Sequence, residues 1–163
     1  MQTLDPKQFE SALTQLFTHQ LALLDDLVQK IGSERAALSG RLSEKIILLA
    51  EEKQSLMQSL DTCLKQGQTI LSHLKNAMPE RSTAELMRWC DPSGDLDQLR
   101  VDVMDKTDLC LAQNRHNGVQ IQRQQQTTKK ALNVLRGESI TSSAYTARGQ
   151  MGDLPSSRSL GEA

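Results

Sequence analysis

The sequence predicts an all-α protein with three long antiparallel helices in a coiled-coil-like bundle, a short helix between the second and third, and a flexible C-terminal tail. Apolar residues recur at steps of three and four over long stretches, which is the spacing of one helix face. Hydrophobic residues make up 37% of the 163 residues, but aromatic residues only 2%. A thin aliphatic seam between long helices fits this composition better than a compact core filled with rings.

The first long helix is predicted to begin at Pro6. Asp5 precedes this proline and Gln8 follows Asp5 by three residues, which is the pattern of a capped helix start. Gly32 is a candidate C-terminal cap or bend, although the helix could resume beyond it as far as Ser39. The stripe of this helix contains Phe9, Leu13, Leu16, Leu23, Leu27 and Ile31, and it is widened by Phe17, Leu24 and Val28.

The second long helix is expected over residues 41–78, with Pro79 ending it. Its apolar residues follow a heptad pattern that only Lys53 and Gly67 interrupt. A single helix with such a stripe must pack on a partner, and the short connection to the first helix favours an antiparallel hairpin. The pattern comprises Leu42, Ile46, Leu49, Leu56, Leu60, Cys63, Ile70 and Leu74.

A short helix with the sequence TAELMRWC follows, opened by the capping-box spacing of Ser82 and Glu85. Trp89 is expected to close one end of the bundle, with an exposed anchor for a partner as the alternative. Asp95 and Gln98 show the same capping-box spacing, and from there the third long helix is expected to run to residue 136.

The middle of this third helix lacks good core residues. Leucines and valines form its seam before Cys110 and leucines restore it near the end, but the stretch between them is polar. We expect Asn114, Asn117 and Gln124 to leave this part poorly satisfied within one chain. The alternative is that residues 114–126 extend past the shorter hairpin into solvent.

The chain is thus predicted to consist of a helical bundle over residues 1–137 and a flexible tail over residues 138–163. The tail is rich in Ser, Gly and Ala and cannot bury enough surface to offset its ordering entropy. Its one tyrosine, Tyr145, gives a partner a possible anchor.

Composition and spacing argue against several functions. A net charge of -1 gives no reason to expect nucleic acid or an anionic membrane as partner. The three histidines and three cysteines are scattered, so no metal site, cofactor or catalytic centre is expected. No apolar run is long enough to span a bilayer, and the N-terminus does not read as a signal peptide, so a cytoplasmic protein without membrane insertion is predicted.

Three features together resemble the FlgN family of flagellar export chaperones. The first is the hairpin with ERAAL at 34–38 and EEKQSLMQSL at 51–60, and the second is the NxxNG element at 114–118 followed by ALNVLRG at 131–137. The third is the tail tyrosine, although the family's tail often reads tyrosine-glycine-x-acid-glycine and the sequence here is YTARG.

The resemblance implies a non-catalytic chaperone that binds hook-associated proteins through its C-terminal amphipathic segment and delivers them to the flagellar export apparatus. Tyr145 is then the expected contact with the export gate. The rival prediction is a structural coiled-coil scaffold or an oligomerising adaptor, and self-association is compatible with either. The expected substrate-binding residues are Asn114, Asn117, Gly118, Ile121, Gln124, Thr128, Ala131, Leu132 and Leu135.

Overall fold

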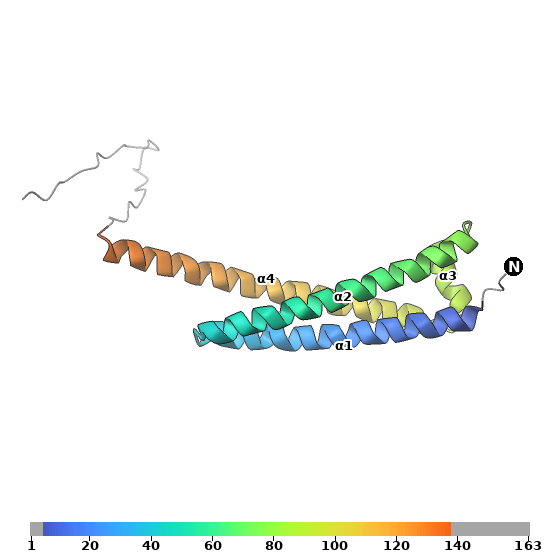
Figure 1. Ribbon diagram of the computed structural model, residues 1–163, viewed down its shortest axis with the longest axis horizontal. Helices are drawn as coiled ribbons and strands as arrows, with labels where there is room; N and C mark the ends of the chain where they lie inside the picture. The colour runs from blue at the N-terminus through green and yellow to red at the C-terminus, as the bar shows by residue number, and fades with distance from the viewer. Residues whose placement is uncertain (1–4, 138–163) are drawn as a thin grey trace, which may run out of the picture. The chain divides into compact units, whose positions relative to one another are not determined.

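The computed structural model describes residues 5–137 and contains four helices and no strand over that range (Figure 1). The all-α class predicted from the sequence is confirmed. The chain divides into two compact units, residues 1–123 and residues 124–163. The predicted tail begins beyond the described residues. The helices are α1 (Pro6–Ser39), α2 (Ser43–Ala77), α3 (Thr83–Cys90) and α4 (Asp95–Leu135).

Side-chain caps fix the starts of α1 and α3. Asp5 Oδ1 accepts a hydrogen bond from the Lys7 backbone N–H at 3.0 Å, and Pro6 is the first residue of α1. At α3, Ser82 Oγ accepts from the Glu85 backbone N–H and the Glu85 carboxylate accepts from the Ser82 backbone N–H. The backbone hydrogen bond from Ser82 is the main reason that the pKa of Glu85 lies below its ordinary value. Both predicted helix starts are confirmed.

The start of α4 differs from the prediction. Asp91 Oδ2 accepts a hydrogen bond from the Leu96 backbone N–H at 2.8 Å, so the capping carboxylate comes from the turn before the helix. Asp95 already belongs to the first turn, and the Gln98 side chain donates to Asp102 at 2.8 Å. The predicted capping box of Asp95 and Gln98 is therefore wrong, because a buried aspartate further upstream reaches the free N–H groups first.

A tight turn joins α1 to α2. Arg41 adopts a left-handed conformation with φ of 54°, and the Leu42 backbone N–H donates to the Ala37 carbonyl at 3.0 Å. This bond closes the last turn of α1 in the manner of a Schellman motif, which usually places glycine at the left-handed residue. Gly40 stands one position earlier, with a φ of -82°. The turn lets α1 and α2 pack along each other as a helical hairpin, as expected (Figure 1).

Two apolar clusters hold residues 1–123 together. The end cluster joins all four helices, and Trp89 packs against it, which confirms the expected position of this side chain. The middle cluster joins α1 and α4, with Leu56 and Leu60 of α2 packed beside it. The end cluster consists of Leu13, Leu74, Leu86, Met87, Cys90 and Leu96, and the middle cluster of Leu24, Leu27, Ile31 and Cys110.

The buried positions of α1 lie within the predicted stripe. Leu24, predicted to widen the stripe, is buried and Leu23 is half-buried, because the buried positions Leu16, Gln20 and Leu24 continue in steps of four. Gly32 neither ends nor caps the helix, since α1 continues to Ser39. The buried stripe thereby extends to Glu34 and Leu38 at the hairpin end.

Gly67 explains one of the two interruptions in the α2 seam. A Cβ atom at this position would lie 3.0 Å from Leu16 Cδ2, so the glycine lets α1 and α2 approach closely. Gly32 has no such role, because nothing lies within 4 Å of a Cβ built there.

We expect opposite effects from substituting these two glycines. Gly32→Ala should raise the free energy of unfolding by about 0.5–1 kcal/mol, because alanine favours the helix and meets no neighbour. Gly67→Leu should lower it by roughly 1–3 kcal/mol, because the added side chain overpacks the contact with Leu16. Urea unfolding followed by circular dichroism measures both values. Equal effects at the two positions would contradict the close approach.

Candidate functional site

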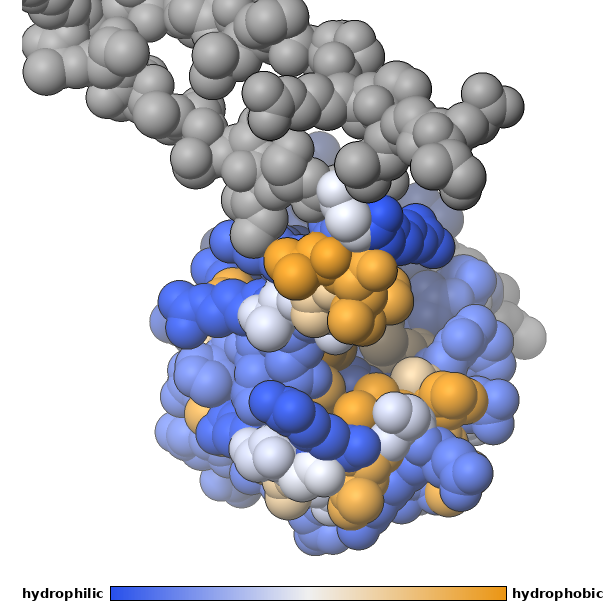
Figure 2. All heavy atoms as spheres, turned by 90° about the vertical axis from the view of Figure 1, so that its left-hand side faces the viewer, coloured by the Kyte–Doolittle hydropathy of each residue, from blue (hydrophilic) through white to orange (hydrophobic). Residues whose placement is uncertain are grey.

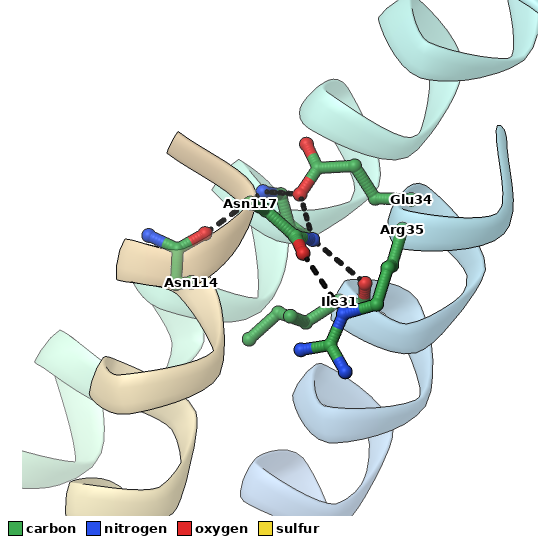
Figure 3. A network of polar contacts seen from close by, with 6 residues as sticks. Ile31, Glu34, Arg35, Asn114 and Asn117 are labelled. Atoms are coloured by element: carbon green, nitrogen blue, oxygen red, sulfur yellow. Dashed lines mark hydrogen bonds and ion pairs between the residues drawn. The ribbon is translucent and has the colours of Figure 1, made fainter. Parts of the chain in front are cut away.

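Asn117 of α4 lies at the centre of a buried polar network that connects three helices (Figure 3). Its amide nitrogen donates to the Ile31 carbonyl and to Glu34 Oε2, each at 2.9 Å. Its amide oxygen accepts from Arg35 Nε at 3.2 Å. Lys53 Nζ of α2 lies 2.7 Å from the same Glu34 oxygen. We call Glu34, Arg35, Lys53, Asn114 and Asn117 the polar layer.

The charged pair in this layer is largely removed from water. The side chain of Glu34 is 4% exposed and that of Lys53 is 14% exposed. A carboxylate with so little access to water is costly unless opposite charge and hydrogen-bond donors surround it. Lys53 and Asn117 supply both, and Lys53 also donates to Asn114 Oδ1 at 3.1 Å. Within the described residues, every buried side-chain nitrogen and oxygen has a hydrogen-bond partner.

This geometry corrects the sequence-based interpretation of the polar stretch. Asn114 and Asn117 were expected to lack partners within one chain, but both are satisfied by α1 and α2. Neither lies beyond the hairpin, since both contact its residues. Asn117, at 1% exposed, has no access to a partner while the bundle is intact. Its polar side chain completes the core instead of interrupting it.

The partners of the two asparagines were missed in the sequence, although signals for them were present. Lys53 stands where the α2 heptads require a core residue. Glu34 continues the α1 stripe between Ile31 and Leu38, at steps of three and four. Opposite charges at core positions of two neighbouring helices indicate a buried ion pair. Nothing in the sequence shows that Asn117 lies at the same level as these two.

The remaining predicted residues of the first unit are less enclosed. Ile121 is half-buried and Asn114 is exposed. Gly118 has nothing within 4 Å of a Cβ built on its backbone, so α4 presents open space at this position. The outer side of α4 in this unit also exposes Met104 and Leu111.

The second unit contains the last turns of α4. Gln124 is half-buried, whereas Thr128 and Ala131 are exposed. The leucines at 132 and 135 are exposed together with Val134. Large aliphatic side chains gathered in the open near a helix end are typical of a surface that a partner covers. Tyr145, the predicted gate contact, lies outside the described residues.

Other exposed apolar residues lie at the hairpin turn and in the first turns of α2. They are Leu42, Ile47 and Leu48. Figure 2 looks at this end of the molecule and shows hydrophobic atoms, in orange, at the surface among hydrophilic ones. Single exposed aliphatic residues are common on soluble proteins, so these residues do not define a site by themselves.

The three cysteines are buried free thiols. Burial raises the pKa of the Cys90 and Cys110 thiols, so both are protonated and weakly nucleophilic at neutral pH. Within residues 5–137, no cluster of His, Cys, Asp and Glu side chains is arranged to hold a metal ion.

No helix in the described part of the chain is long and apolar enough to cross a membrane.

The described residues form an all-helical protein, and the end of α4 carries exposed aliphatic side chains. The chain matches the family described as "FlgN protein" over residues 9–153. It therefore belongs to the FlgN family, which indicates a flagellar export chaperone. Neither a curated protein nor a solved structure matches the chain.

The polar layer should be sensitive to the loss of one charge. Lys53→Met leaves Glu34 without its ion-pair partner, so we expect the free energy of unfolding to fall by roughly 3 kcal/mol. Adding Glu34→Gln to Lys53→Met should recover at least half of that loss, because the buried charge is then absent. Urea unfolding of the two single variants and the double variant measures the coupling.

The matched control is Lys30→Met, which breaks the exposed ion pair with Glu52 at the same distance of 2.7 Å. We expect it to cost less than about 1 kcal/mol, because water screens both of these charges. If Lys30→Met lowered the free energy of unfolding as much as Lys53→Met does, burial of the ion pair would not explain its contribution to stability.

Proposed function

We propose that this chain is a cytoplasmic chaperone for the flagellar hook-associated proteins. It binds their terminal helices, prevents premature assembly and delivers them to the flagellar export gate. Membership of the FlgN family carries the proposal, and the exposed aliphatic residues at the end of α4 support it. No step requires a cofactor or catalysis.

The proposed binding surface is narrower than the sequence suggested. Helical spacing places Asn114, Ile121, Thr128 and Leu135 on one line, with Gly118 and Leu132 on the next. Asn117 lies on the adjacent line that faces the core, so we assign it a structural role. Gln124 and Ala131 continue that line within the second unit. We propose that these two residues contact the substrate there.

Helix-in-groove recognition provides the mechanism. A substrate helix with apolar residues at steps of three and four can cover Leu132 and Leu135, which otherwise remain in water. Polar side chains such as Asn114 and Thr128 can then hydrogen-bond at the edge and set the register.

A scaffold or adaptor function is the second candidate. In that case the end of α4 would bind other copies of this chain and no flagellar protein. The family match favours the chaperone, because a scaffold gives no reason for a match that extends over the bundle and into the tail.

Substrate binding should depend on the leucines at the end of α4. The double variant Leu132→Asp with Leu135→Asp should weaken binding of a hook-associated protein at least tenfold, because it places two charges in an apolar contact. Leu48→Asp on α2 is the matched control, since this leucine is also exposed. Co-purification followed by calorimetry measures the affinity. Equal binding by both variants would contradict this surface.

Tyr145 should matter for export and not for binding. Tyr145→Ala is expected to retain affinity for the hook-associated protein while export falls several-fold, because the aromatic anchor for the gate is lost. Secreted hook-associated protein in culture supernatants measures export, and Tyr145→Phe tests whether the ring alone suffices. Unchanged export by Tyr145→Ala would rule out the docking role.

A further inference from the structure

The outer side of the bundle between α2 and α4 carries apolar residues at matching heptad positions of both helices. Lys53 Nζ donates to Asn114 Oδ1 at 3.1 Å, which places these two residues at the same level of the bundle. Met57 follows Lys53 by one turn and Leu111 precedes Asn114 by about one turn, so both lie next to this hydrogen bond on its outer side. Heptad steps along these antiparallel helices, all within residues 1–123, then pair Ala50, Met57 and Leu64 of α2 with Gly118, Leu111 and Met104 of α4.

The large side chains on this side are open to solvent. On α2, Met57 is 60% exposed and Leu64 is 56% exposed. On α4, Met104 is 53% exposed and Leu111 is 59% exposed. Two neighbouring helices that expose apolar residues toward one common side leave the position that a further helix of a bundle would occupy. We call these four residues the α2–α4 face.

The α2–α4 face can adapt to the shape of a partner helix. Two of its four residues are methionines, whose unbranched side chains adjust to different contacts. The next heptad pair, Ala50 and Gly118, is small, and nothing lies within 4 Å of a Cβ built at the glycine. A partner helix therefore finds space for a large apolar side chain at that end of the face.

Both edges of the face carry a carboxylate near its middle. Asp61 follows Met57 by one turn of α2, and Asp108 precedes Leu111 by about one turn of α4, so each lies further out than its apolar neighbour. Asp61 forms an ion pair with Lys65 at 2.7 Å, but this pair is exposed and therefore weak. A helix with Lys or Arg on both edges of its apolar stripe complements the two aspartates, whereas acidic edges are repelled.

From the matching heptads and the acidic edges, we propose that the α2–α4 face binds an amphipathic helix whose apolar stripe is bordered by lysine or arginine on both sides. The inference rests on the proposed function for the identity of the partner, which is then a helix of a hook-associated protein. It adds α2 to a binding surface that the proposed function places on α4. The 15 residues from Ala50 to Leu64 span about 22 Å, which is the length of two heptads of the bound helix.

Calorimetric titration of the full chain with a hook-associated protein tests the contribution of α2. Met57→Glu should weaken binding at least tenfold, because it places a charge in an apolar contact. Leu48→Glu is the matched control, since this leucine is exposed on another side of the same helix, and it should leave the affinity unchanged. Urea unfolding verifies that both variants remain folded. Wild-type affinity in Met57→Glu, or equal losses in the two variants, would overturn the proposal.

Synthetic peptides test the edge chemistry without a flagellar protein. Each peptide is an amphipathic helix of about three heptads with leucine in its stripe, and its edges carry either lysine or glutamate. Fluorescence anisotropy with the full chain should show at least tenfold tighter binding of the lysine peptide. Asp61→Lys combined with Asp108→Lys should reverse this preference, and Met57→Glu should weaken binding of both peptides. Equal binding of the two peptides, or a preference that the double variant leaves unchanged, would contradict the proposed edges.

Failure of this inference is distinguishable from failure of the proposed function. If Met57→Glu binds a hook-associated protein normally while Leu132→Asp with Leu135→Asp does not, the proposed function stands and the α2–α4 face is not used. If the wild-type chain binds no hook-associated protein, the proposed function fails. In that case, binding of the lysine peptide that is lost in Met57→Glu still supports the face, and no binding of this peptide overturns it.

Discussion

The buried carboxylate of Glu34 is the constraint on which the arrangement of the long helices depends. Its side chain is almost fully removed from water, and it is held by Lys53 from α2 and Asn117 from α4. Aliphatic seams with heptad spacing can slip by seven residues and still bury leucine on leucine. A buried ion pair cannot slip in this way, because every other register leaves a charge in an apolar layer. The polar layer therefore aligns three helices that have few large side chains to do so.

Much of the helical structure could be predicted from the sequence because its signals are local. The caps at Asp5 and Ser82 act within three residues, and the helix bounds followed from them. The cap of α4 was misjudged because two aspartates, Asp91 and Asp95, were available, and burial decided between them. Both Leu23 and Leu24 belong to the predicted stripe, and only packing decides that Leu24 is the more deeply buried of the two.

The candidate site was harder to predict, since its residues meet only in three dimensions. The asparagines of α4 were recognised as unusual, but their partners lie 61 to 86 positions away in the sequence. The interruption at Lys53 and the interruption at Asn117 looked like two defects in two seams. In the structure they satisfy each other through Glu34, so the apparent defects form one feature. The exposed leucines at the end of α4 are not part of this layer and form the proposed surface for partners.

The polar layer also limits how this sequence can change over time. Replacing Glu34 removes an acceptor from both Lys53 and Asn117, and replacing either of those two leaves the Glu34 carboxylate short of a donor, so single substitutions should destabilise the bundle. Acceptable changes must arrive in matched sets, for example a neutral residue at both 34 and 53. Relatives that share this bundle should therefore show these three positions varying together, even where the surrounding leucines exchange freely for other aliphatic residues.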